Sequence, residues 1–194
     1  MTIELDGSSL TRAQVVEIAC RGRDVSLSPK ALQRVQRAAD FLAEKVSCGE
    51  PVYGVTTGFG SNADKLLGAH RVRDELPGGN PEHHEGSLLE ELQHNLLITH
   101  AVCVGEPLAA DVVRAILAIR INTLLRGHSG IRVATLEAMT ALLNRKVIPV
   151  IPAKGSVGAS GDLAPLSHLA IVLLGAGEAF VEGERVSGAE ALQR

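Results

Sequence analysis

The sequence predicts a mainly α-helical fold, and three of its properties point to that class. The chain has 194 residues, which is enough for one domain with a real hydrophobic core. Apolar residues make up 45% but aromatic residues only 2%, so the core must be built from Leu, Val, Ile and Ala. Such an aliphatic composition favours packed helices over a β-sandwich. Start and stop signals for helices also recur along the chain.

The first two helices are expected within the first fifty residues. One spans 11–20, with Thr11 as its N-cap. The next has Ser28 as N-cap and Pro29 at the first helical position, and it ends before Gly49. Apolar residues recur in it at spacings of three and four, which predicts one buried face made of Leu32, Val35, Ala39, Leu42 and Val46.

The next forty residues carry weaker signals. Residues 51–57 are rich in β-branched side chains and bounded by glycine, so we expect an extended piece that runs into a turn. The segment 60–86 has no sustained hydrophobic period and contains Gly78-Gly79-Asn80-Pro81. It is expected to be a long exposed loop, with at most a helical turn near 69–75.

The second half of the chain carries signals for four further helices and a hairpin. A capping box at 87–90 opens the first of these helices, and Gly127 stops the second. Two prolines make 147–152 an extended lead into a glycine-rich segment. A small hairpin is expected over 179–186, turning at Glu182-Gly183. The four helices are expected over 87–104, 110–126, 133–145 and 163–174.

The last residues suggest that more chain follows. A second capping box stands at 187–190, only four residues before Arg194. A helix start with almost no helix behind it predicts that the chain is truncated from a longer protein. No internal repeat or low-complexity segment divides it, so we expect 1–194 to form one domain.

Charge and cysteine content limit the partners and the cellular compartment that are expected for the protein. The formal net charge of −3 gives no reason to expect nucleic acid or an anionic membrane as a partner. No signal peptide follows Met1, and the longest apolar run, 169–175, is too short to span a bilayer. The three cysteines form no CxxC pair and leave an odd thiol, which favours a reduced, cytoplasmic protein; they are Cys20, Cys48 and Cys103.

The glycine-rich segment 154–168 is the part of the sequence that points to chemistry. A phosphate-binding loop would need G-x-x-x-x-G-K-[ST] after a strand of a βαβ unit, and neither is present. A serine nucleophile in a G-x-S-x-G elbow also fails, because Ser160 stands in Gly158-Ala159-Ser160-Gly161-Asp162. A plain flexible loop before a helix and a self-modifying loop remain.

Self-modification has a physical logic in the tripeptide Ala159-Ser160-Gly161. The unhindered Gly161 nitrogen can attack the Ala159 carbonyl when small residues let the backbone bend back upon itself. Loss of one water from the new ring and of the Ser160 hydroxyl as a second water leaves a 4-methylidene-imidazol-5-one. Its exocyclic methylene is an electrophile that no standard side chain supplies. The start of the following helix would stabilise negative charge that develops on addition.

Four stretches, in this order along the chain, resemble a known family. Residues 155–168 are similar along their whole length to the signature of the histidine, phenylalanine and tyrosine ammonia-lyases and their aminomutase relatives. The octapeptide Tyr-Gly-Val-Thr-Thr-Gly-Phe-Gly at 53–60 also resembles a family motif. Two further stretches, 92–101 and 120–130, match as well. The chain is identified as the N-terminal part of a member of this family.

The resemblance implies an active site. Ala159-Ser160-Gly161 would form the methylidene-imidazolone autocatalytically, and Tyr53 would be the catalytic base. The Gly60 amide would lie beside the substrate, and His100 would contact the substrate's ring or its polar group. The loop 61–86 would cover the active site as a lid.

The resemblance also implies an assembly. The whole enzyme would be a mostly helical, cytoplasmic homotetramer, with each active site built from several subunits and an aromatic amino acid as substrate. Family members are much longer than this chain. The chain would therefore stop before the long central helix bundle, and the remaining pocket residues would lie beyond Arg194.

Several functions stay open within and outside this family. Conversion of L-histidine to urocanate and ammonia is the first choice, because Thr99-His100 resembles the corresponding pair of histidine lyases. Thr56-Thr57 instead favours a tyrosine or phenylalanine ammonia-lyase or a 2,3-aminomutase. A third possibility, from another class, is a catalytically incomplete fragment or an assembly module.

Neither a metal nor a nucleotide is expected as a cofactor. His83-His84-Glu85 and His94 match neither H-E-x-x-H nor a Cys/His finger. His128 and His168 are expected to hold structure or to contact the residues that surround the site. Asp162 is expected to cap the following helix and to orient the glycine-rich loop.

Overall fold

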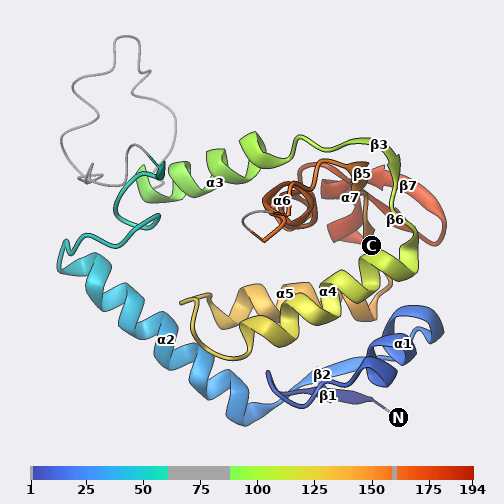
Figure 1. Cartoon of the computed structure of the whole chain (residues 1–194), viewed down its shortest axis with the longest axis horizontal. Coiled ribbons are helices and arrows are strands. Elements are labelled where there is room, and N and C mark those ends of the chain that lie inside the picture. The colour runs from blue at the N-terminus through green and yellow to red at the C-terminus, as the bar shows by residue number, and fades with distance from the viewer. Residues whose placement is uncertain (1, 61–87, 159–160) are drawn as a thin grey trace. The chain divides into compact units, whose positions relative to one another are not determined.

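The fold is known from a computed structural model that describes residues 2–60, 88–158 and 161–194 (Figure 1). The chain forms two compact units. The larger unit combines Met1–Ala39 with Leu97–Arg194, and the smaller one is Asp40–Leu96.

Helices dominate the described part of the chain. They are α1 Arg12–Arg21, α2 Pro29–Ser47, α3 Leu88–His100, α4 Ala110–Leu124, α5 Val133–Asn144, α6 Leu163–Val172 and α7 Gly188–Gln193. The strands are short: β1 Ile3–Leu5, β2 Val25–Leu27, β3 Val104–Pro107, β4 Ile148–Pro149, β5 Pro152–Lys154, β6 Glu178–Val181 and β7 Glu184–Ser187. The predicted mainly α-helical fold, with short extended segments and a hairpin, is confirmed.

Helix α4 forms the centre of the larger unit. Its residues Val113, Leu117 and Ile121 have no exposed area, and the helix packs against α1 and α5. Other fully buried side chains of the same core come from the strands and helices around it, namely Leu5, Ile18, Val35, Leu136, Leu143 and Ile151. Within the described residues, the buried members of this core are aliphatic side chains and Met139, as the composition predicts, and the partly buried Phe180 packs against them.

Predicted start signals are present at helices α1, α2 and α7. Thr11 Oγ1 accepts a hydrogen bond from Gln14 N, and the Gln14 side chain accepts one from Thr11 N, so α1 opens with a capping box. Helix α2 begins at the predicted Pro29. At the start of α7, Ser187 Oγ accepts from Glu190 N at 3.2 Å.

The strands form three small sheets. β1 and β2 pair in parallel, β3 and β5 pair antiparallel, and β4, β6 and β7 form an antiparallel sheet in that order. The predicted hairpin is β6–β7, and it turns at Glu182 and Gly183, whose φ angles are 52° and 86°. Two consecutive left-handed residues give the turn the twist that a two-residue hairpin needs.

One helix end was predicted too late. Helix α3 ends at His100, four residues before the expected end, because Val104 pairs with Lys154 between β3 and β5. The strand pairing satisfies backbone groups that a longer helix would have used, so tertiary structure overrides the local helical pattern. Ser87, the predicted cap of α3, and the proposed lid 61–86 lie outside the described residues.

None of the helices within 2–60, 88–158 or 161–194 is both long and apolar enough to cross a bilayer.

Candidate active site

The segment around Tyr53 is a compact turn in the smaller unit, not the extended piece expected over 51–57. The Val52 carbonyl accepts hydrogen bonds from the backbone nitrogens of Val55, Thr56 and Thr57 at 3.0 to 3.3 Å. Side-chain hydroxyls stabilise this turn in a way that the β-branched composition did not reveal. Thr56 Oγ1 accepts from Val52 N at 2.7 Å and donates to the Glu50 carbonyl at 2.6 Å.

The Phe59 ring and the neighbouring Gly54 set the position of the Tyr53 side chain. The Tyr53 and Phe59 rings meet edge to face, with centroids 6.1 Å apart and planes at 85°. Gly54 has φ 71°, and a Cβ there would lie 2.6 Å from Phe59 Cε1. A side chain at position 54 would therefore collide with the Phe59 ring, and the left-handed backbone also favours glycine there. Tyr53 is 65% exposed within the described chain.

The turn brings two predicted site residues together. The backbone nitrogen of Gly60 donates a hydrogen bond to Tyr53 Oη at 3.3 Å. The phenol oxygen is thus exposed and faces an amide donor.

In the larger unit, the glycines on either side of Ala159-Ser160 have left-handed backbone. Gly158 and Gly161 have φ angles of 72° and 84°, with open space around the place of a Cβ. Ala159 and Ser160, which stand between them, lie outside the described residues. The flanking glycines provide the conformational freedom that a backbone cyclisation requires.

Asp162 occupies the N-cap position of α6, but its carboxylate does not cap the helix. Its backbone is left-handed, with φ 60°, and its side chain makes no hydrogen bond to the helix amides. Instead Asp162 Oδ1 accepts a hydrogen bond from Ser156 Oγ. The expected side-chain cap is therefore wrong, whereas the contact does tie one side of the loop to the other.

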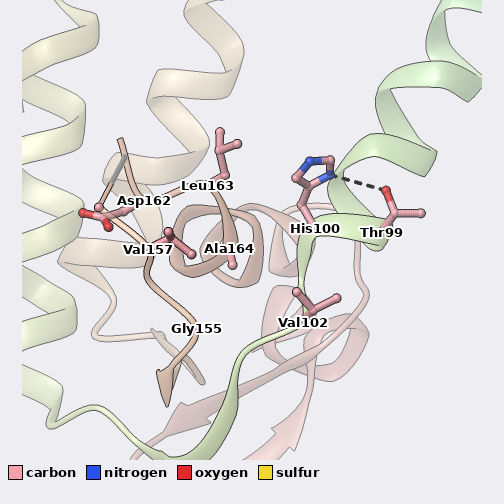
Figure 2. A pocket seen from close by; sticks show the side chains of 9 residues that line it. Thr99, His100, Val102, Gly155, Val157, Asp162, Leu163 and Ala164 are labelled. Carbon is pink, nitrogen blue, oxygen red and sulfur yellow. Dashed lines mark hydrogen bonds between the residues drawn. The ribbon is translucent and has the colours of Figure 1, made fainter. Parts of the chain in front are cut away.

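A cavity of about 230 Å³ lies between this loop and the end of α3 (Figure 2). One wall comes from Thr99, His100 and Val102. The other wall comes from the glycine-rich segment and the first turn of α6, namely Gly155, Val157, Gly158, Asp162, Leu163 and Ala164. The predicted substrate residue His100 therefore faces the loop that contains the reactive tripeptide.

The polar and apolar groups of the cavity have different origins. His100 Nδ1 lies 3.4 Å from Thr99 Oγ1, so the imidazole has a polar neighbour on its own helix. Val102, Val157 and Leu163 contribute apolar side chains to the lining, and none of them was predicted as a site residue. Val157 and Leu163 lie within the signature 155–168, so their proximity to the tripeptide was the signal that could have found them.

His168 and Cys103, which do not line the cavity, join α6 to the segment that follows α3. His168, on α6, accepts a hydrogen bond at Nε2 from Cys103 N at 3.0 Å, and burial lowers the pKa of this imidazole. Burial also raises the pKa of the Cys103 thiol, so the thiol stays protonated. His128 is exposed. The structural role expected for His168 agrees with this hydrogen bond.

The described residues contain no cluster of three or more His, Cys, Asp or Glu side chains that could hold a metal ion. His83-His84-Glu85 lies outside them. Tyr53 and Gly60 belong to the smaller unit and the cavity to the larger one.

Comparisons with known proteins agree with the motifs. Residues 10–194 match the model of the family described as aromatic amino acid lyase. Histidine ammonia-lyase of Symbiobacterium thermophilum is 50% identical over 188 residues, which are 97% of this chain and 34% of that protein.

Two solved structures are similar over the whole chain. The histidine ammonia-lyase of Trypanosoma cruzi has a TM-score of 0.81 and 34% identity, over 100% of this chain and 34% of that one. The tyrosine aminomutase of Streptomyces globisporus has a TM-score of 0.81 and 33% identity, over 100% of this chain and 33% of that one. The chain thus spans about a third of the length of these proteins.

Proposed function

The chain belongs to the aromatic amino acid lyase family, and we propose that it is the ring-forming N-terminal domain, 1–194, of a histidine ammonia-lyase. The reaction is the conversion of L-histidine to urocanate and ammonia. The observation that carries this proposal is the cavity in which His100 faces the loop of Ala159-Ser160-Gly161. The 50% identity to a histidine ammonia-lyase supports the choice of substrate.

The loop fits the formation of a methylidene-imidazolone from its own residues. Gly158 and Gly161 are left-handed and unobstructed, so the backbone on both sides of the tripeptide can bend. The Gly161 nitrogen forms a bond to the Ala159 carbonyl carbon, and two waters leave, one of them carrying the Ser160 hydroxyl oxygen. The resulting group supplies an electrophilic carbon to which the substrate adds. No metal or nucleotide takes part.

Tyr53 is proposed as the general base that removes a β-hydrogen of the substrate. Its oxygen is exposed within the described chain and accepts a hydrogen bond from Gly60 N. The Gly60 amide also lies close enough to Tyr53 to contact a substrate held there.

His100 is proposed to recognise the substrate's ring. Its imidazole lines the cavity beside Thr99 and can exchange hydrogen bonds with another imidazole. The aliphatic walls of Val102, Val157 and Leu163 suit the flat faces of an aromatic ring. The cavity thus combines the His100 imidazole and the other polar side chains, Thr99 and Asp162, with apolar walls.

A second candidate is a tyrosine or phenylalanine ammonia-lyase or a 2,3-aminomutase. The Thr56-Thr57 pair favours it, and so does the similarity to a tyrosine aminomutase. A candidate from another class is a catalytically incomplete fragment or assembly module. We place the enzyme in the cytoplasm as a homotetramer, with sites built from several subunits and no nucleic acid or membrane partner.

The three candidates differ in product. The full-length protein is incubated separately with L-histidine, L-tyrosine and L-phenylalanine, and products are separated by chromatography. We expect urocanate and ammonia from histidine. Formation of a β-amino acid would identify an aminomutase, and no product from any of the three would leave the assembly module as the better account.

A further inference from the structure

We propose that His168 is a positioning residue for the substrate-facing segment 99–103, which it holds through the hydrogen bond from the Cys103 backbone. The inference rests on the proposed function, because it assigns His168 a part in binding the substrate of that site. His168 does not line the cavity, so it would act through the residues that do.

The hydrogen bond holds the chain just after α3 ends. Beyond His100 the Val102 nitrogen still donates to the His100 carbonyl at 2.9 Å, but Cys103 N donates to His168 Nε2 at 3.0 Å, 65 residues further along. Cys103 is only 8% exposed, so few other partners can reach this amide. The path of the chain from the helix to the strand therefore depends on an imidazole from α6.

A second contact fixes the same segment against the start of the glycine-rich loop. A Cβ on Gly155 would lie 2.9 Å from Cys103 Cα, so the two backbones approach as closely as glycine allows. The next residue, Val104, pairs with Lys154 in the β3–β5 sheet. Cys103 is thus held between the beginning of the loop and the helix that follows it.

Both walls of the cavity depend on this junction. Thr99, His100 and Val102 precede Cys103 directly, and the opposite wall includes the first turn of α6, the helix that carries His168. The Cys103–His168 bond therefore sets the distance between the ring-recognising wall and the wall next to the reactive tripeptide. Its loss would disturb substrate binding more than formation of the ring.

Only the neutral imidazole can make this contact. Because the Cys103 nitrogen is the donor, Nε2 must be the unprotonated nitrogen and Nδ1 carries the proton. An imidazolium has donors at both nitrogens and cannot accept. Burial lowers the pKa of His168, which favours the neutral form.

A pair of amide substitutions separates positioning from packing. In His168→Gln the side-chain oxygen reaches the place of Nε2 and can accept from Cys103 N, whereas in His168→Asn it reaches only the place of Nδ1. Both variants are polar and uncharged. The exposed His128→Gln substitution serves as a control for loss of an imidazole elsewhere.

The test uses the full-length enzyme, with rates expressed per ring measured by its ultraviolet absorbance. We expect His168→Asn to raise KM for L-histidine about tenfold, the factor for one lost hydrogen bond, with a smaller change in kcat. His168→Gln should stay within about threefold of the parent, and His128→Gln should be unchanged.

Other outcomes overturn the proposal. Equal KM values for His168→Asn and the parent would mean that the bond does not position substrate. Equal impairment of the Asn and Gln variants, or loss of ring or fold in His168→Asn alone, would assign His168 to packing or folding. If the parent acts on tyrosine and not histidine, the proposed substrate is wrong, and the same comparison on tyrosine still decides the role of His168.

Discussion

Tyr53 carries the clearest prediction at the scale of single residues. Replacing it by Phe removes only the phenol oxygen, which accepts the Gly60 hydrogen bond, and leaves the edge-to-face contact with Phe59 possible. Turnover in the full-length enzyme should fall on the order of a hundredfold to ten-thousandfold, as expected for a lost general base. KM should change far less. Steady-state kinetics per ring measure both, and full activity of Tyr53→Phe would make Tyr53 structural.

His100 should control which amino acid is accepted. Its imidazole can pair with the ring of histidine or the phenol of tyrosine but gains nothing from a bare phenyl group, and buried polar groups reject partners that leave them unpaired. The full-length enzyme should therefore prefer histidine to phenylalanine. His100→Phe should shift the ratio of the two kcat/KM values by about tenfold or more towards phenylalanine. An unchanged ratio would remove His100 from the substrate site.

Part of this site could be predicted from the sequence. The motif around Tyr53 predicted a base through its resemblance to the family, and Tyr53 is hydrogen-bonded to Gly60. The contacts that matter for shape were not predictable, because they join residues far apart in the chain. Cys103 and His168 are 65 residues apart, and no local pattern links a backbone amide to that imidazole.

At the scale of elements, one buried cation joins three helices. Arg114 on α4 is only 6% exposed. Its Nε and Nη2 donate to the Ile18 carbonyl of α1 at 3.1 and 2.9 Å, and its Nη1 donates to the Leu143 carbonyl of α5 at 3.1 Å. These carbonyls lie in the last turns of their helices, where cations are favoured. Burial lowers the pKa of Arg114, yet arginine stays charged.

Arg114→Met should destabilise the larger unit. The change leaves two buried helix-end carbonyls without their donor, at a cost of about 2–4 kcal/mol in the free energy of unfolding. Urea denaturation compares it with Arg120→Met, an exposed position on the same helix, which should change stability by less than about 0.5 kcal/mol. Equal stability of the two variants would contradict the capping role of Arg114.

The helices and turns were predicted correctly mainly where they depend on residues that are close together in the sequence. The capping box at Thr11, the side-chain cap of Ser187 and the turn at Glu182-Gly183 depend on neighbours a few residues away, and all three are present; of the capping box predicted at 187–190, the structure has the bond from Glu190 N to Ser187 Oγ. The end of α3 was predicted too late because it depends on the pairing of Val104 with Lys154, far along the chain. Over 51–57 a turn was expected, but the side-chain hydroxyl bonds that replace the expected extended piece by a compact turn were not.

At the scale of the whole molecule, composition and four motifs led to the mainly α-helical class and to the family. They do not settle the substrate, because histidine lyases and tyrosine aminomutases share the fold at similar identity. Substrate choice depends on a few side chains in a cavity whose walls come from segments about sixty residues apart, at 99–102 and 155–164. The sequence pattern does not indicate how far apart these two segments lie in the folded chain.

Conversion of Ala159-Ser160-Gly161 into the electrophile can be measured by intact-mass spectrometry of the folded full-length protein. We expect a mass lower by two waters, with the loss localised to the peptide that contains 159–161 and accompanied by a new ultraviolet band. Ser160→Ala should keep its unmodified mass apart from the substitution, lack the band and have no lyase activity, because no hydroxyl is present to leave. A folded, full-length protein with an unmodified mass, or Ser160→Ala with more than a few percent of the parent's turnover, would contradict this conversion.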